Sequence, residues 1–483
     1  MKTTLIFAAL AAASLPALTY GCSSVDCNSN GTCGNNPTDS GAQSDAQPGV
    51  DAPPGCDLTK DPKDSPACID DGVGVFVDGS KGVDSNPGTK SATVKTVGKA
   101  LELAGAKRVY VCEGTYPESV VVKAKVSVYG GFTCADWKPG VAPVQIAPSQ
   151  EGYALDIQKV DGAVTLVDLA FEAKAGSEAA PNSIAARVDT SSNVTFRRVS
   201  LTAKDGAQGK PGDGGTTGTY LAGNGDGTPA DGTMRGATKT CTCSGGVTTT
   251  GGAGGDTGGQ GGGPGLTAVA GATPPVDGVG GTGGAMCGAG GLGHTGATPP
   301  PAGAAPKPVS EGSLQNGAWA PAGGGTGGQG VAGQGGGGGA SRGLNSYGGG
   351  GACGGCPGTG GKGGGGGGAS IALLTIGSTV SVQECKVHVG TGGTGGTGGT
   401  GGGGGNGGGS LNGCQGGDGG KGGDGGAGAG GAGGLSVGIA YQGTKPEGQF
   451  SFTPGTPGEG GKGGIPGTND GVKGAGGETY AIP

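Results

Sequence analysis

The stretch SIALLTIGSTVSVQECKVHVG, residues 370–390, is rich in Val and Ile and alternates apolar with polar residues. This pattern is typical of a β-strand. Glycine surrounds it, because the chain reads GGKGGGGGGA before it and TGGTGGTGGTGGGGG after it. A strand needs neighbours for its backbone hydrogen bonds, so residues 370–390 must pair with segments that are distant in the sequence.

Two upstream segments repeat the pattern of this stretch. Its core has the same spacing as both of them: Val380-x-Val382-x-x-Cys385-x-Val387, Val194-x-Phe196-x-x-Val199-x-Leu201 and Val164-x-Leu166-x-x-Leu169-x-Phe171. The preceding strands also correspond: Ser370-Ile371-Ala372-Leu373, Ser183-Ile184-Ala185-Ala186 and Ala154-Leu155-Asp156-Ile157. Coils that repeat in this way stack strand over strand. The sequence therefore predicts an all-β fold, a short right-handed parallel β-helix (a solenoid).

Glycine divides the predicted solenoid into parts, since 129 of the 483 residues are Gly and 30 are Pro. A helix is expected within 91–106, because Val94, Val97, Leu101 and Ala104 fall on one helical face, and it would cap the first rung. The predicted divisions are a signal peptide (1–22), a disordered tether (23–70), the first part of the β-helix (71–205), a Gly-rich excursion (206–368), a rung (369–390), a second excursion (391–434), a last rung (435–453) and a Gly-rich tail (454–483).

The three Gly-rich segments all begin where the third strand of a rung ends, after Leu201, Val389 and Phe452. The pattern predicts that they leave one corner of the solenoid on successive levels. In residues 391–400 Thr recurs every third residue, which is the period of a polyproline II helix. Neighbouring chains can approach closely where no Cβ intervenes. We expect a packed, hydrogen-bonded flange; the alternative is flexible coil.

The N-terminus, MKTTLIFAALAAASLPALTYGC, has the basic residue, short apolar run and small residues of an export signal. Residues 18–22, LTYGC, resemble a bacterial lipoprotein box in which Cys22 is acylated, and Ser23 favours the outer membrane. Secretion without a lipid, with Cys22 in a disulfide, is the alternative. Few large apolar residues occur in 23–70, so this segment is expected to be a flexible tether.

Fourteen Cys in an exported chain point to disulfides. The expected pairs are Cys27–Cys33, Cys56–Cys68 and Cys112–Cys134. A further four Cys lie at the two ends of the long excursion and predict disulfides, with a metal cluster as the alternative: Cys241, Cys243, Cys353 and Cys356. Cys385 takes the place of Leu169 and Val199 in the repeat, which predicts a buried free thiol. We expect no metal and no cofactor.

Residues 78–122 resemble the opening of pectin-lyase-like β-helix proteins. The resemblance rests on a pattern of residues that ends in G-x-Y-x-E: Asn86, Gly88, Thr89, Thr96, Ala100, Gly114, Tyr116 and Glu118. The continuation VSVYGGFTCADW (126–137), followed by Gly-rich excursions, is similar to bacterial surface lipoproteins of the PGRS type. These resemblances imply a parallel β-helix displayed at the cell surface.

An enzymatic function finds little support in the sequence. The QDT-, DFIFG- and GRPW-like stretches of pectin methylesterases do not occur. Pectate lyases need clustered acids for Ca²⁺ and a basic residue. The corresponding bend positions hold Asp168, Arg198 and Glu384, which form either a solvated charge ladder or a polysaccharide-facing site. A net charge of −7 argues against nucleic-acid binding.

The sequence thus predicts a non-enzymatic lipoprotein, anchored in the outer membrane at the cell surface. Its Gly-rich segments would make adhesive, structural or envelope contacts with a polysaccharide or a protein. The alternative is a β-helix that binds or cleaves polysaccharide.

Overall fold

A computed structural model describes residues 50–266, 277–283, 303–411 and 414–483 of the chain. All of them belong to one compact unit, Gln47–Pro483. Cys22, Cys27 and Cys33 lie outside the described residues, as does most of the expected tether.

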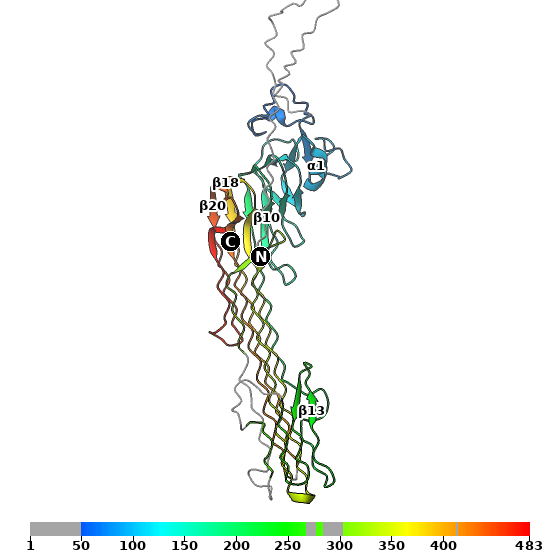
Figure 1. Ribbon diagram of the computed structural model, residues 1–483. Helices are drawn as coiled ribbons and strands as arrows, with labels where there is room; N and C mark the ends of the chain where they lie inside the picture. The colour runs from blue at the N-terminus through cyan, green and yellow to red at the C-terminus, as the bar shows by residue number, and fades with distance from the viewer. Residues whose placement is uncertain (1–49, 267–276, 284–302, 412–413) are drawn as a thin grey trace, which may run out of the picture. The chain divides into compact units, whose positions relative to one another are not determined.

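Parallel strands stack in three columns (Figure 1). The first column holds β1 (Gly74–Val77), β2 (Arg108–Cys112), β5 (Val126–Phe132), β8 (Val164–Val167) and β11 (Val194–Arg197). The second holds β3 (Gly114–Tyr116), β6 (Val144–Ile146), β9 (Ala170–Glu172) and β12 (Ser200–Thr202). Two longer strands, β18 (Val380–His388) and β20 (Glu447–Thr453), extend through both columns and join them into one curled 11-stranded sheet. The third column is a six-stranded sheet: β4 (Val120–Val122), β7 (Leu155–Gln158), β10 (Ser183–Asp189), β17 (Ser370–Ile376), β19 (Ser436–Gln442) and β21 (Gly476–Ala481).

The stretch 370–390 pairs with the segments that its pattern predicted. Val194 lies between Val164 and Val380, and Leu201 lies between Phe171 and Val387. Residues 435–453 add the next level, as expected, through β19 and β20. The tail contributes β21, a strand that no apolar pattern in residues 454–483 predicts.

The predicted register of the third column is wrong for one pair of strands, β7 and β10. Ser183 pairs with Ser370 as expected. Leu155 pairs with Ala186, however, and not with Ile184. The shift is two residues, which leaves the same side chains facing inward. The apolar pattern is therefore satisfied equally by both registers.

A single α-helix among the described residues, α1 (Val97–Ala104), packs against β1, β2 and β4. The Thr96 side chain accepts a hydrogen bond from the Lys99 backbone and caps the N-terminus of α1. Glu118 adds a second cap from the sheet, since its two carboxylate oxygens accept from the backbone nitrogens of Val97 (2.8 Å) and Gly98 (3.0 Å). Burial raises the pKa of Glu118. The last residue of the G-x-Y-x-E pattern thus fastens the helix to the stack.

Residues 50–70 are packed against the sheet instead of forming a flexible tether. A short 3₁₀ helix, η1 (Pro66–Cys68), ends at the disulfide Cys56–Cys68. The Tyr110 hydroxyl donates to the Cys68 carbonyl at 2.6 Å. The Arg108 guanidinium donates to the carbonyls of Leu58 and Lys60. The tether expected for 23–70 therefore does not include this part.

The described cysteines follow the expected pattern. Cys112–Cys134 forms, and the two ends of the long excursion are joined by Cys241–Cys353 and Cys243–Cys356. These bonds exclude the alternative of a four-Cys metal cluster. They also fasten the hairpin β13 (Lys239–Thr242) and β14 (Thr248–Gly251) to the returning chain. Cys385 is free and only 1% exposed, as predicted.

The Gly-rich segments form a hydrogen-bonded bundle, which confirms the expected flange. Figure 1 shows them as traces that lie alongside one another. Residues 206–218, 391–405 and 454–464 leave the second column, whereas residues 354–368 and 417–434 return to the third. Every third backbone N–H of the first segment, from Gly206 to Gly215, donates to a carbonyl in the row Thr391, Thr394, Thr397 and Thr400, at 2.7 to 2.9 Å. Residues 322–341 run beside the returning segments. This segment follows the hairpin β15 (Gly312–Gln315) and β16 (Ala318–Pro321), and η2 (Gly343–Asn345) comes after it.

Each segment of the bundle repeats every three residues. The number of glycines in each three-residue repeat reflects how many sides of the segment contact another segment. Residues 206–218 have one inward row, and a Cβ on Gly209 would lie 2.1 Å from the Gly365 carbonyl oxygen. Residues 391–400 have two inward rows. A Cβ on Gly392 would lie 2.2 Å from the Gly434 oxygen, and one on Gly393 would lie 1.8 Å from the Ala207 oxygen. The Thr row between them is exposed. In these two segments, glycine is therefore required only in the rows that touch another backbone.

Candidate functional site

The three predicted site residues occupy equivalent bends in the first two columns, on successive levels of the stack. Asp168 follows β8, Arg198 follows β11, and Glu384 lies at the irregularity within β18. Each has a positive φ, between 54° and 56°. This left-handed conformation shifts the phase of the strand, so the following residue points into the core. All three residues line one hollow of about 550 Å³.

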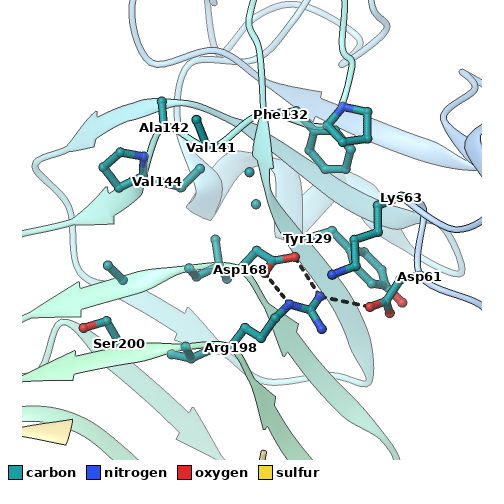
Figure 2. A pocket seen from close by; sticks show the side chains of 18 of the residues that line it. Asp61, Lys63, Tyr129, Phe132, Val141, Ala142, Val144, Asp168, Arg198 and Ser200 are labelled. Carbon is teal, nitrogen blue, oxygen red and sulfur yellow. Dashed lines mark hydrogen bonds and ion pairs between the residues drawn. The ribbon is translucent and has the colours of Figure 1, made fainter. Parts of the chain in front are cut away.

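Asp168 and Arg198 form a two-point ion pair in this hollow (Figure 2). Arg198 Nε lies 2.7 Å from Asp168 Oδ1, and Arg198 Nη2 lies 2.8 Å from Asp168 Oδ2. Arg198 Nη2 also donates to Asp61 Oδ2 at 3.0 Å. The hydrogen bonds to Asp168, and then those to Asp61, raise the pKa of Arg198. Arg198 therefore stays charged and does not act as a base.

Asp61 connects two arginines, since its carboxylate also pairs with Arg197. Its side chain is only 7% exposed. A carboxylate with so little access to water needs charged partners, and the two guanidinium groups provide them. Asp61 thus holds residues 57–63 against the sheet.

Glu384 lies apart from this network. It is exposed, and within the described ranges no cation lies within ion-pairing distance of it. It lines the hollow together with Lys386. The structure therefore brings the three residues to one hollow but pairs only two of them, so the charge ladder is incomplete.

Three further side chains line this hollow that were not expected from the sequence: Asp61, Lys63 and Tyr129. Figure 2 shows them around the Arg198 guanidinium. Asp61 and Lys63 fall in a polar segment that carries no strand or helix pattern. The only sign that this segment is folded was the spacing of Cys56 and Cys68, which form a disulfide. Apolar residues close the other side of the hollow: Phe132, Val141, Ala142 and Val144.

The described residues contain one group whose atoms are close enough to hold a metal ion, namely Asp78, Cys112 and Cys134. The two sulfur atoms are bonded to each other. A disulfide sulfur is not a thiolate, and only the thiolate is a good ligand. This group is therefore structural.

The outer surface of the Gly-rich bundle is a second candidate for contact. Its exposed Thr row is flanked by segments with charged side chains, some of which pair between neighbouring segments, as in Lys362–Asp213 (2.9 Å) and Lys473–Glu459 (2.6 Å). Other carboxylates accept from outward-facing backbone, as when Asp424 Oδ1 binds the Gly404 nitrogen at 2.7 Å. The bundle thus presents a polar surface on a fixed backbone.

No family of known proteins, no curated sequence and no solved structure matched this chain. Among the described residues, no helix has the length and the hydrophobicity needed to cross a bilayer.

Proposed function

We propose that this chain is a non-enzymatic lipoprotein of the cell surface, in which a right-handed parallel β-helix displays a Gly-rich bundle for adhesion or envelope contact. The observation that carries the proposal is the bundle itself. Its backbone groups bond to neighbouring segments at every third residue, so a region with almost no apolar core keeps a defined shape. Such a structure offers a long, rigid and polar contact surface instead of a concave site.

The three-column stack supports the β-helix as the base of this display. Parallel columns in register bury one continuous cluster of apolar side chains between them, from Val75 in β1 to Ile439 in β19. The pattern shared with pectin-lyase-like proteins supports the same architecture, because its residues fasten α1 over the first strands.

The proposed anchor is a lipid on Cys22. Residues 18–22 support it through their lipoprotein-box pattern. Two or more acyl chains are needed for stable attachment to a membrane, and acylation of an N-terminal Cys provides them. The test is detergent partitioning and intact mass of the mature protein. Cys22→Ser should abolish partitioning, and a mature wild-type chain without lipid would contradict the anchor.

The contact function is tested with substitutions that disturb the packing of the bundle but keep all of its segments. Gly393→Ala together with Gly396→Ala places Cβ atoms about 2 Å from carbonyl oxygens of the neighbouring segment. Binding of the purified protein to envelope fragments should fall in this variant. It should be retained in the matched control Gly403→Ala, where the nearest atom would be 3.9 Å away. Equal binding by both variants would contradict a role for the bundle.

A second candidate function, polysaccharide binding or cleavage, is favoured by the hollow at the bends. Asp168, Arg198 and Glu384 line it from three successive coils, and Tyr129 supplies an aromatic surface. The test is the triple variant Asp168→Asn, Arg198→Gln, Glu384→Gln, assayed for binding and cleavage of uronate polymers. Activity in the wild type that the variant loses would establish this function, and an inactive wild type would exclude it.

A further inference from the structure

A second hollow, of about 410 Å³, lies on the outer face of the first column and shares Asp61 and Tyr129 with the hollow at the bends. Hydroxyl side chains of three adjacent strands line its floor. Thr165 lies between Ser127 and Thr195 in the register of the sheet. Adjacent strands are about 4.8 Å apart, so these hydroxyls form an evenly spaced row.

Positive charge dominates this second hollow. Asp61 is the one carboxylate that the described residues contribute to its lining. The lining also includes four cations: Lys107, Arg108, Lys125 and Arg197. Lys107 Nζ donates to the Asp71 backbone carbonyl at 2.7 Å, and Arg108 bonds to backbone carbonyls of residues 58 and 60. These carbonyl acceptors are neutral and leave the positive charge uncompensated. Lys125 is exposed, and no carboxylate of the described residues lies within ion-pairing distance of it.

Two guanidinium nitrogens at this hollow have no hydrogen-bond partner. They are Arg108 Nη1 and Arg197 Nε, and both are shielded from solvent. Arg108 as a whole is 8% exposed. Buried donors in folded proteins nearly always have an acceptor. Because both nitrogens are shielded, a ligand in the hollow reaches them only when the groups that cover them move, and their lack of an acceptor then favours a ligand that provides one.

We propose that the second hollow binds an oxoanion with more than one negative charge, that is, a phosphate or sulfate group, either free or esterified to a lipid or a glycan. The excess of cations over carboxylates favours such a group over a single carboxylate. A guanidinium presents its N–H groups in the fork that matches two oxygens of such an anion. The row of hydroxyls supplies further donors.

The order of contacts follows from the burial of each cation. Lys125 is exposed and the Arg197 side chain is 30% exposed, so an entering anion meets these two first. Arg108 is covered by the carbonyls of residues 58 and 60, and it becomes available only if residues 57–61 shift. Asp61 already pairs with Arg197, so it competes with the ligand. Binding in the second hollow is thus coupled to residues 57–61.

The experiment is calorimetric titration of the purified chain, at constant ionic strength, with inorganic phosphate and inorganic sulfate. Lys125→Gln should weaken binding about tenfold, because a hydrogen bond between charged groups contributes on that order. The matched control Lys123→Gln removes an exposed cation outside the hollow and should leave binding unchanged. Asp61→Asn should strengthen binding, since it removes the competing carboxylate.

Further titrations separate the sources of the anion. Phosphatidic acid vesicles are compared with phosphatidylcholine vesicles, and a sulfated oligosaccharide is compared with its desulfated form. Lys125-dependent binding of any of these anions supports the site and identifies its source. The proposal is overturned if none of the anions binds, or if Lys123→Gln weakens binding as much as Lys125→Gln. Circular dichroism of each variant shows whether a loss of binding reflects misfolding.

Discussion

Replacing one inward glycine of the bundle by alanine should open the bundle locally. A Cβ on Gly396 would lie 2.1 Å from the Lys210 carbonyl oxygen, whereas ordinary contact begins at 3.4 Å. The two segments must therefore separate by the difference, 1.3 Å. Three hydrogen bonds depend on this contact. The Lys210 oxygen that the Cβ would displace accepts from Gly365 of the returning segment (2.8 Å). The two segments themselves are joined by Gly209 to Thr394 (2.8 Å) and Gly212 to Thr397 (2.7 Å).

The size of the effect follows from these bonds. Each contributes about 1 kcal/mol net, so their loss costs about 3 kcal/mol. Alanine also restricts the unfolded chain, which offsets roughly 0.4–1 kcal/mol. The free energy of opening should fall by about 2 kcal/mol for Gly396→Ala. Gly403→Ala, with its nearest contact at 3.9 Å, should be neutral or slightly stabilising.

Amide hydrogen exchange read by mass spectrometry measures this opening directly. A loss of 2 kcal/mol raises exchange roughly thirtyfold in peptides from 206–218 and 391–403. Peptides from the stacked strands should not change, because the substitution lies outside them. If peptides 206–218 and 391–403 exchange equally slowly in Gly396→Ala and Gly403→Ala, close backbone contact is not the reason that glycine occupies the inward positions.

Three other outcomes are expected. Hydrogen bonding from Gly404 lowers the pKa of Asp424, so this bond contributes its full stability above the unfolded pKa, near 4, and loses it as the pH falls through the lower folded pKa. The protection of the Gly404 amide, measured against an unstructured peptide at the same pH, should therefore decrease as the pH falls below about 4. Glu118→Ala should cost about 1–2 kcal/mol in urea unfolding by uncapping α1, whereas Glu102→Ala, at an exposed pair, should cost under about 1 kcal/mol. Burial raises the pKa of the Cys385 thiol, so its alkylation in the native protein should be at least about a hundredfold slower than in urea; rapid labelling would contradict burial.

The stack was predictable because each coil repeats one apolar spacing. Val164, Val194 and Val380 align without ambiguity, since the two-residue bend follows at the same distance in each of the three repeats. The register of Leu155 was not predictable. A shift of two residues keeps every side chain on its face, so only packing between neighbouring strands selects the pairing with Ala186.

The candidate site was predictable only in part. Asp168 and Arg198 could be placed together because the repeat fixes the position of the bend. Their third partner, Asp61, comes from more than 100 residues upstream, in a segment without periodicity. The disulfide Cys56–Cys68 was predictable and closes this segment into a loop. The ion pairs that place Asp61 beside the two arginines leave no pattern in a single sequence.

The three-residue repeat of the bundle constrains how its length can evolve. One inserted triplet lengthens a segment by roughly 9 Å, at about 3.1 Å per residue. Where a segment bonds to neighbours on several sides, each neighbour must gain a triplet as well. Otherwise the residues beyond the insertion no longer lie opposite their present hydrogen-bond partners. Insertions of one or two residues would turn side chains into the backbone contacts. The bundle can therefore grow or shrink only in threes and in concert, whereas its outward rows are free to change one residue at a time.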